Sequence, residues 1–360
     1  MKKLMLVPLT LICAVLLAGC SDEPKIEFDT IENVKSGISD AFSENYDHIT
    51  IPEDIKVEIP DSLSIYDPKS EPVIESKDDP KTAQTISLLY DPDDFDKSKN
   101  RSDSMLINTL NAESGNPTYQ FLNETKDEHA AISRNGYVHL GPDELLSYEV
   151  TACEYIDRLD DNETYQKAIT AANAKIKEAV EMQGNSEMKP YLFYTVKSSA
   201  GNTFYMVYFC KLIDGVPCIP FGTDRPVNMG GPANTDFQLR WIKQSFYVFV
   251  DEDFNARCIH IDNKSSSEKA ETVENIATLD SVLDYISKTT AANLTIDIRN
   301  ISLMYASDSV DRKIYPVWYI EYRNRKAQSP DAEEYNRVII NAVNGLVTSY
   351  IENNCYVKQG

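Results

Sequence analysis

The stretch Phe204-Tyr205-Met206-Val207-Tyr208-Phe209-Cys210-Lys211-Leu212 decides how the fold is predicted. Successive residues of a strand point to opposite faces, and almost all residues of this stretch are apolar or aromatic on both faces. A strand that is apolar on both faces is typical of the interior of a covered sheet. We therefore expect a central strand over residues 204–212.

The residues around this strand predict a helix and several further strands. Apolar residues recur at three- and four-residue spacing over residues 165–180, with Glu163 at the start, which indicates an amphipathic helix. The acidic turn Asp251-Glu252-Asp253 predicts a hairpin between two apolar runs. The other strands expected in this half cover residues 118–122, 130–133, 137–140, 191–196, 246–250 and 257–261.

The same order of elements returns after residue 270. A second amphipathic helix is expected over residues 279–286. Within residues 314–322, the alternation predicts that Trp318 faces a helix while Tyr319 and Glu321 face outward. The strands expected here cover residues 294–298, 302–305, 314–322, 337–343 and 346–351. A helix followed by antiparallel strands, occurring twice, predicts the α+β class, with a helix packed on each sheet.

The first third of the chain is strongly acidic. Residues 21–130 carry 26 acidic and 10 basic residues, and residues 21–79 are also rich in serine and proline. This composition is typical of a solvated, flexible segment. The expected organisation is therefore a signal peptide over 1–19, an acidic tether over 20–80, a first α+β unit with an N-terminal extension over 81–270, and a second unit over 271–360.

The N-terminus predicts export. Lys2 and Lys3 precede an apolar run over residues 4–17, which is too short for the roughly 20 residues of a membrane-spanning helix. The run ends in Leu17-Ala18-Gly19-Cys20, which resembles the lipobox of bacterial lipoproteins. That resemblance implies cleavage between Gly19 and Cys20 and a diacylglycerol on the thiol of Cys20. An ordinary secretory peptide or an uncleaved anchor is the alternative.

Charge limits the classes of partner. The formal net charge of -22 repels phosphate backbones, so nucleic acid is not an expected partner, and anionic lipid surfaces are equally unfavourable. Lipid on Cys20 would nevertheless hold the protein on the extracytoplasmic face of the cell membrane, because each buried methylene contributes about 0.8 kcal/mol and two acyl chains hold firmly.

Two turn-centred motifs carry a family resemblance. Ile213-Asp214-Gly215-Val216-Pro217 lies in the first half, and residues 314–320 followed by residues 338–347 lie in the second. Together they resemble PepSY modules and the related YycH/YycI extracytoplasmic regulators. With the lipobox and the acidic linker, they also resemble a DUF6034-like family of uncharacterised lipoproteins from Gram-positive bacteria. The resemblance implies a regulatory role toward a surface enzyme or sensor. Regulators of the YycI type are held by a transmembrane helix, which a lipid replaces here.

No catalytic motif is complete. Residues 186–189 match the SxxK motif of penicillin-recognising enzymes, but its companion elements are missing. The acidic cluster over residues 91–96 lacks the glycine of a calcium loop, and Ser102 stands where the bidentate glutamate belongs. The loop over residues 228–232 either lines a ligand or only connects strands. We expect neither a metal nor a cofactor.

The cysteines and histidines show no motif either. Outside the N-terminal region the cysteines are Cys153, Cys210, Cys218, Cys258 and Cys355, and none forms a CxxC pair. We interpret Cys210 and Cys258 as small buried residues, while a disulfide between some pair stays open. His48, His129, His139 and His260 have no spacing that points to a catalytic partner.

These observations favour a non-catalytic surface lipoprotein that binds another protein or a peptide. The alternative is the capture of a cell-wall polymer or solute, for which Trp241 is the best aromatic candidate among many tyrosines. Hydrolase activity is the least favoured because no nucleophile, acid–base pair or metal set is assembled.

The lipid anchor predicts the behaviour of a single variant. Cys20→Ala should remove the acylated thiol, so the protein should remain unprocessed or be released from membranes. Membrane fractionation and mass spectrometry of the mature N-terminus measure this. Processing that is insensitive to globomycin, with no acyl group on the N-terminus, would contradict the prediction.

Overall fold

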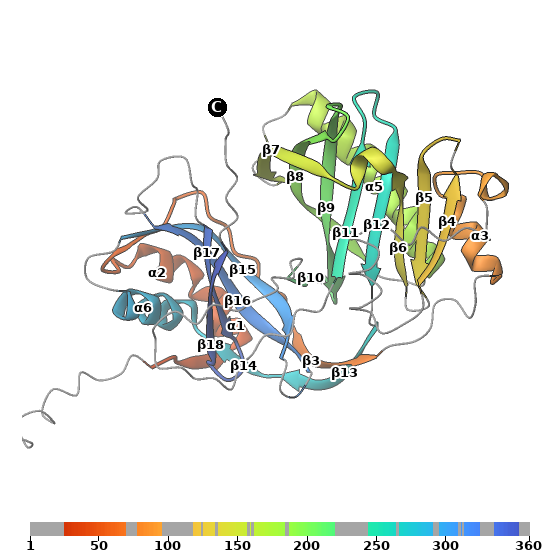
Figure 1. The fold of residues 1–360 in the computed structure, drawn as a ribbon. Coiled ribbons are helices and arrows are strands. Elements are labelled where there is room, and N and C mark those ends of the chain that lie inside the picture. The colour runs from red at the N-terminus through yellow and green to blue at the C-terminus, as the bar shows by residue number, and fades with distance from the viewer. Residues whose placement is uncertain are drawn as a thin grey trace, which may run out of the picture.

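The structure is a computed structural model. It describes residues 25–69, 78–95, 118–123, 125–133, 136–156, 159, 162–183, 187–219, 244–263, 266–290, 295–308, 311, 313–324 and 335–352. In this part of the chain, two large sheets dominate the fold, and each is covered by helices on one face (Figure 1). None of the helices described is long and apolar enough to cross a bilayer.

The nine-stranded sheet comes from the middle of the chain. Its order is β4-β5-β6-β12-β11-β9-β8-β7, with β10 paired only to β9, and its pairs are antiparallel. The expected central strand is confirmed, because β9 lies between β11 and β8. The strands are β4 (Thr118–Asn123), β5 (Glu128–Ser133), β6 (Tyr137–Pro142), β7 (Tyr148–Tyr155), β8 (Met188–Ser198), β9 (Thr203–Ile213), β10 (Val216–Pro217), β11 (Gln244–Val250) and β12 (Ala256–Asn263).

Helix α5 (Glu163–Gln183) covers one face of this sheet, as the periodicity predicted. Ala168, Ala172 and Ala179 are fully buried against the strands. Small side chains at these positions let the helix axis come close to the aromatic residues of β9 and β11. A shorter helix, α3 (Pro80–Ile86), contacts α5, and the single turns η2 (Pro92–Asp94) and η3 (Asp143–Leu145) lie beside strands of this sheet.

The seven-stranded sheet combines both ends of the chain. Its path is β13-β3-β16-β15-β2, and β17 and β18 extend from β16. A separate pair, β1 (Phe28–Thr30) with β14 (Asn275–Ala277), ties the N-terminal segment to the C-terminal part. The strands are β2 (Ile49–Thr50), β3 (Leu63–Lys69), β13 (Ser266–Val273), β15 (Ile296–Ser307), β16 (Ile314–Asn324), β17 (Tyr335–Asn341) and β18 (Val347–Glu352).

Three helices cover one face of the seven-stranded sheet. They are α1 (Ile31–Ser36), α2 (Ile38–Ser43) and α6 (Leu279–Thr289). The expected amphipathic helix is α6, whose apolar stripe of Leu279, Val282, Leu283 and Ile286 is buried. Thr278 caps it, because its hydroxyl oxygen accepts a hydrogen bond from the backbone N–H of Ser281.

The opposite face of the seven-stranded sheet packs against the nine-stranded sheet. A buried cluster joins the two, with Cys210 and Ile219 on one side and residues of β15, β16 and β17 on the other. Backbone hydrogen bonding continues across the junction, because the N–H of Ile219 donates to the carbonyl of Tyr305 at 2.9 Å. The boundary between the two sheets is therefore formed by buried apolar side chains and by backbone hydrogen bonding.

The prediction of two helix-plus-sheet units of the α+β class is wrong. The described residues are mostly β, with two large antiparallel sheets and few helices, and they do not form a pair of PepSY-like modules. The sequence periodicity located individual elements, but strand partners are set by long-range packing.

The prediction of a flexible tether over residues 20–80 is also wrong for the part of it that the structure describes, residues 25–69 and 78–80. Residues 28–69 form β1, α1, α2, β2 and β3, and β3 is hydrogen-bonded between β13 and β16. Many of their apolar residues lie in the core, among them Val34, Leu63 and Tyr66. The many acidic residues of this segment made its composition resemble that of a flexible chain, so the buried apolar residues were not recognised.

Two local expectations are corrected as well. Tyr319 and Glu321 do not face outward; both are buried at the boundary between the sheets. The strands expected over 294–298 and 302–305 form one strand, β15, with a bulge between Ile298 and Asn300. The turn-centred motifs do contain turn residues: Asp214 and Gly215 in the first motif have positive φ, and so does Gly345 in the second.

A buried ion pair lies at the boundary between the sheets. The Nε of Arg337 is 3.3 Å from Glu321 Oε2, and both side chains are almost fully buried. The same carboxylate accepts hydrogen bonds from the hydroxyls of Tyr155 on β7, at 2.7 Å, and Tyr319, at 3.2 Å. Burial, together with Tyr191 and Glu321 nearby, holds the pKa of Tyr155 well above its usual range, so its hydroxyl stays a donor.

This pair predicts a large stability loss in a single variant. Arg337→Met leaves the carboxylate of Glu321 buried without its cation, which typically costs about 3–5 kcal/mol. Urea unfolding followed by tryptophan fluorescence measures it, because Trp318 is fully buried in the same sheet. The double variant with Glu321→Leu should recover part of the loss, and a loss in R337M below about 1 kcal/mol would contradict the assignment.

Candidate functional site

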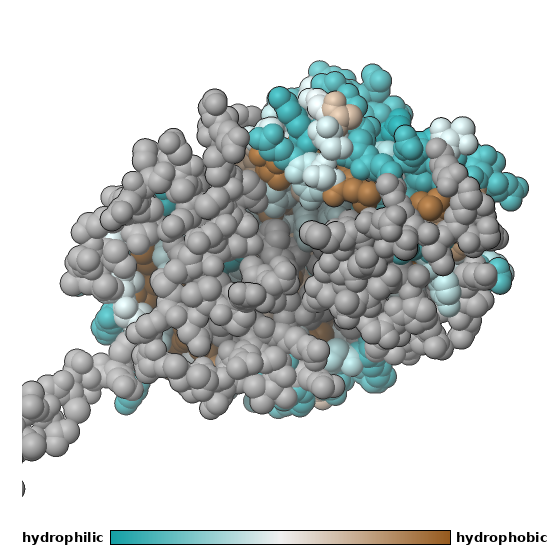
Figure 2. Space-filling model, viewed as in Figure 1, coloured by the Kyte–Doolittle hydropathy of each residue, from teal (hydrophilic) through white to brown (hydrophobic). Residues whose placement is uncertain are grey.

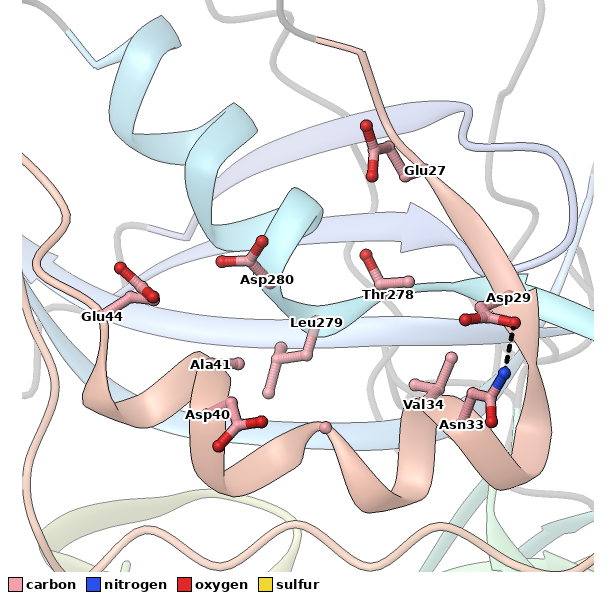
Figure 3. A pocket seen from close by; sticks show the side chains of 11 residues that line it. Glu27, Asp29, Asn33, Val34, Asp40, Ala41, Glu44, Thr278, Leu279 and Asp280 are labelled. Carbon is pink, nitrogen blue, oxygen red and sulfur yellow. Dashed lines mark hydrogen bonds between the residues drawn. The ribbon is translucent and has the colours of Figure 1, made fainter.

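A hollow of about 320 Å³ lies between α1, α2 and the start of α6 (Figure 3). Its floor is apolar, formed by the buried side chains of Val34, Ala41 and Leu279. Its lining includes five carboxylates and no lysine, arginine or histidine. The carboxylates are Glu27, Asp29, Asp40, Glu44 and Asp280. The hollow therefore combines an apolar floor with a negative rim.

The N-terminal strand fixes one side of this hollow. The backbone N–H of Glu27 donates to the hydroxyl of Ser281 at 3.0 Å, and the N–H of Thr278 donates to the carbonyl of Glu27 at 2.9 Å. These bonds hold β1 against the first turn of α6. Asp29 accepts a hydrogen bond from Asn33 Nδ2 at 2.9 Å, which together with the N–H of Thr30 lowers the pKa of that carboxyl.

On the opposite side of the hollow, Tyr46 links α2 to the start of α6. Its hydroxyl donates to Asp280 Oδ1 at 2.7 Å and lies 2.9 Å from the carbonyl oxygen of Ala41. Burial and the bond to Asp280 raise the pKa of Tyr46, so the phenol stays neutral beside the carboxylates. Glu27, Asp40 and Glu44 are exposed, so their charges are solvated at the rim of the hollow.

The fold of the chain resembles a solved structure. The crystal structure of an uncharacterized protein from Eubacterium rectale ATCC 33656 aligns over 88% of this chain and 97% of that one, with a TM-score of 0.54 and 18% identity. At that identity the likeness concerns the fold alone. No family model matches the chain, and no curated protein matches it.

Several residues that the sequence singled out lie outside the described residues. They are Gly19 and Cys20 of the lipobox, Ser102, Ser186 of the SxxK match, the loop over 228–232, Trp241 and Cys355. The lipid anchor, the membrane location and the DUF6034-like resemblance therefore stay predictions.

The acidic cluster over residues 91–96 forms a turn within its described part. Asp91 caps η2 by accepting a hydrogen bond from the N–H of Asp93 at 3.0 Å, and Asp94 pairs with Lys126 at 2.7 Å. Asp91 and Asp94 therefore stabilise the local turn through these contacts. Among the residues described, no three His, Cys, Asp or Glu side chains are arranged so that they could hold a metal ion.

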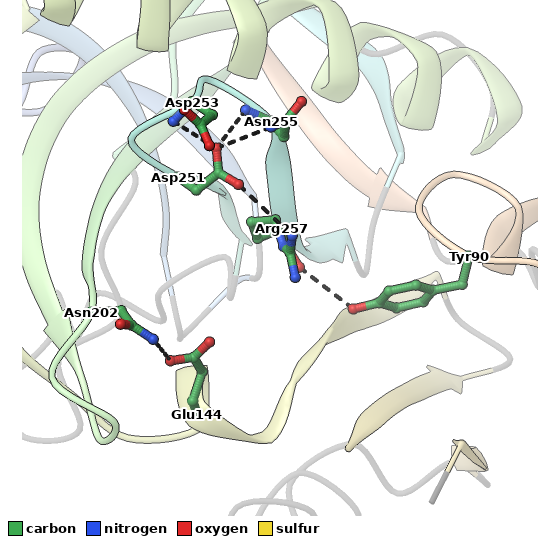
Figure 4. Close-up of polar contacts among 7 residues, drawn as sticks. All are labelled: Tyr90, Glu144, Asn202, Asp251, Asp253, Asn255 and Arg257. Atoms are coloured by element: carbon green, nitrogen blue, oxygen red, sulfur yellow. Dashed lines mark hydrogen bonds and ion pairs between the residues drawn. The ribbon is translucent and has the colours of Figure 1, made fainter. Parts of the chain in front are cut away.

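The acidic turn between β11 and β12 is used in the same way (Figure 4). Asp251 Oδ1 accepts hydrogen bonds from the N–H groups of Asp253, at 3.1 Å, and Asn255, at 2.8 Å. Its other oxygen lies 3.8 Å from Arg257 Nη1, and the hydroxyl of Tyr90 reaches the carbonyl of Arg257. The expected hairpin is confirmed, and its acidic residues stabilise the turn.

Exposed aromatic residues are sparse on the described surface. On the face that Figure 2 shows, the coloured surface of the nine-stranded sheet is largely hydrophilic. Among the described residues, the large hydrophobic side chains that are exposed are Phe28, at 43%, and Tyr148, at 38%. Most described tyrosines are core or boundary residues, which leaves little described surface for stacking on a sugar ring.

Cys210, Cys218 and Cys258 are free thiols. Cys210, Cys218 and Cys258 are buried, which confirms the interpretation of Cys210 and Cys258 as small core residues. Burial raises the pKa of Cys218 to about 12, with Lys211 opposing the shift. These thiols are therefore poor nucleophiles at neutral pH.

Three of the four histidines meet, which the sequence did not reveal. His129 on β5, His139 on β6 and His260 on β12 lie on the face of the nine-stranded sheet that points away from α5. The Sγ of Cys258 is 3.9 Å from His139 Nε2. We call these four residues the histidine layer. His139 and His260 are direct cross-strand partners, so only the strand register could have disclosed the layer.

Gly141 makes room for the histidine layer. A Cβ at this position would lie 2.9 Å from the Sγ and 3.1 Å from the Cβ of Cys258. Gly141→Ala should therefore destabilise the protein by about 1–3 kcal/mol, the usual cost of overpacking. Thermal or urea unfolding measures the change.

A double variant tests the cause of that loss. Cys258→Ala removes the closer of the two clashing atoms, so combining it with Gly141→Ala should cost less than the sum of the single changes. Additive losses would contradict the contact between Gly141 and Cys258.

Proposed function

We propose that the chain is a non-catalytic lipoprotein of the cell surface that binds a basic, amphipathic segment of another surface protein in the hollow between α1, α2 and α6. The supporting observation is the pairing of an apolar floor with a rim of five carboxylates. A segment with lysines or arginines around an apolar side chain matches both parts at once.

The position of the hollow supports a partner at the membrane. Glu27 is the seventh residue after Cys20, and an extended chain of that length spans at most about 25 Å. If Cys20 is lipidated, the side of the hollow formed by Glu27 lies within that distance of the anchor. A juxtamembrane or surface-exposed segment of a membrane protein is then within reach, while an anionic lipid surface is repelled.

The hollow does not favour the capture of an uncharged polymer. Its rim consists of exposed carboxylates. A cationic solute would satisfy the rim but not the apolar floor, so it should bind more weakly than an amphipathic segment. Capture of a solute is therefore the competing outcome of the binding test.

Binding should depend on the rim charges. Asp40→Asn, Glu44→Gln and Asp280→Asn together should weaken binding of a synthetic lysine–leucine amphipathic peptide by about 0.6–3 kcal/mol, because each exposed pair contributes about 0.2–1 kcal/mol. Fluorescence anisotropy measures the change, and added salt should weaken the wild-type interaction in the same direction.

A charge-matched variant controls for net charge. Glu149→Gln, Glu154→Gln and Glu252→Gln remove the same number of exposed carboxylates far from the hollow and should leave binding unchanged. Equal weakening in both triple variants would show non-specific attraction. Equal affinity for lysine–leucine peptide and for a small diamine would favour solute capture. Crosslinking in intact cells from position 33, with recovery of a membrane protein, then tests the partner.

A further inference from the structure

The histidine layer lies where β6 pairs with β12 in the nine-stranded sheet. β6 and β12 join the meander of β4, β5 and β6 to the rest of the sheet, and they pair over only four residue pairs. His139 and His260 form one of these pairs, directly opposite each other. A change in the charge of either ring therefore acts on the bonds that hold the meander.

The rings of the layer touch one another. His129 stacks on His139 with centroids 4.9 Å apart, and His139 meets His260 edge to face at 5.5 Å. His260 in turn stacks on Tyr247 at 4.3 Å, with the ring planes only 3° apart. All three imidazoles are buried.

The contact between two of the nitrogens limits the charge of the pair. His139 Nδ1 and His260 Nδ1 are 3.3 Å apart, so one of them donates and the other accepts. At least one ring must therefore be neutral while the contact is made. If both rings were protonated, two N–H groups would face each other and the contact would become repulsive.

The groups that face the pair offer little compensation for a positive charge. Among the residues described, the titratable groups around it are His129 from β5, Tyr137 from β6, Tyr247 from β11, Cys258 from β12 and Asp143 from η3. Tyr148 from β7 and Tyr208 from β9 lie beyond Tyr247. Asp143 is the carboxylate of this set, and it lies 3.4 Å from His129 Nδ1, on the far side of the layer from His260. Burial, and then His129 and His260, hold the pKa of His139 well below its usual range.

We propose that the histidine layer is an acid-sensitive latch, in which proton uptake by His139 and His260 releases the β4–β5–β6 meander from β12. In the closed state, the contact between His139 and His260 stabilises the junction between β6 and β12 as long as at least one of the two rings is neutral. In the open state both rings reach water and bind protons near their ordinary pKa of about 6.5. Acid therefore favours the open state.

The number of protons bound in each state determines how the opening constant depends on pH. The folded-state pKa of His139 is depressed, so the open state binds more protons and gains on the closed state as pH falls below about 6.5. One extra proton raises the opening constant about tenfold per pH unit, and two raise it about a hundredfold. Above about pH 7 the rings of the open state are largely neutral, so opening should depend little on pH.

Hydrogen exchange on the full mature chain tests the latch. Protection factors of the amides of β5, β6 and β12 should fall from about pH 7 to about pH 5 by more than tenfold per pH unit. Those of β15 and β16, in the other sheet, should change far less. Equal protection of β6 at both pH values, or a parallel loss in β15 and β16, would overturn the proposal.

Histidine variants separate this effect from general acid unfolding. His260→Gln keeps a polar partner for His139 but removes one proton site, so the slope should fall to about tenfold per pH unit. His48→Asn alters the remaining histidine, away from the layer, and should leave the slope unchanged. If the protection factors of H260Q depend on pH as steeply as those of the wild type, that result would count against the latch. If H260Q does not fold, the pH dependence of the wild-type protection factors still tests the proposal.

Discussion

Pairing of β3 between β13 and β16 is the interaction on which the rest of the structure depends. The seven-stranded sheet takes β2 and β3 from the N-terminal segment, and α1 and α2 from the same segment cover its apolar face together with α6. Leu63 and Ile65 of β3 are buried in that core. Without this segment, the apolar face of the C-terminal strands would be exposed to water, at a cost of about 1.5–3 kcal/mol for each large side chain.

This pairing also determines where the candidate site lies. The hollow exists because α1 and α2 fold back onto α6, and Glu27 and Asp29 enter its rim because β1 is fixed to β14. The folded body therefore begins soon after the predicted lipid attachment site. A long spacer would place the rim carboxylates clear of the headgroups, whereas a short one keeps them near any membrane-bound partner.

Sequence periodicity predicted the elements that carry strong local patterns. The strands β9 and β16 and the helices α5 and α6 were located because their apolar residues recur at strand or helix spacing. The grouping of strands into sheets was not predictable in this way, because β13 is rich in serine, glutamate and lysine and β3 follows a proline-rich acidic stretch. Their positions are set by partners far away in the chain.

The same limit applies to the sites. Tyr319 and Glu321 looked like an outward-facing pair because alternation alone cannot show that a second sheet covers the other face of β16. The histidine layer is contributed by three strands, and its members meet only in the folded register. The hollow joins residues 27–44 to residues 278–280, which are far apart in the sequence, and no local motif marks it.

The most direct measurement is hydrogen exchange of the N-terminal segment in the mature protein at neutral pH. If residues 63–66 complete the seven-stranded sheet, their amides should be protected to the same free energy of opening as those of β16, and they should lose protection together with β16 in denaturant. Exchange of residues 63–66 at the rate of an unstructured peptide, while β16 remains protected, would contradict the integrated fold and the membrane-proximal site built on it.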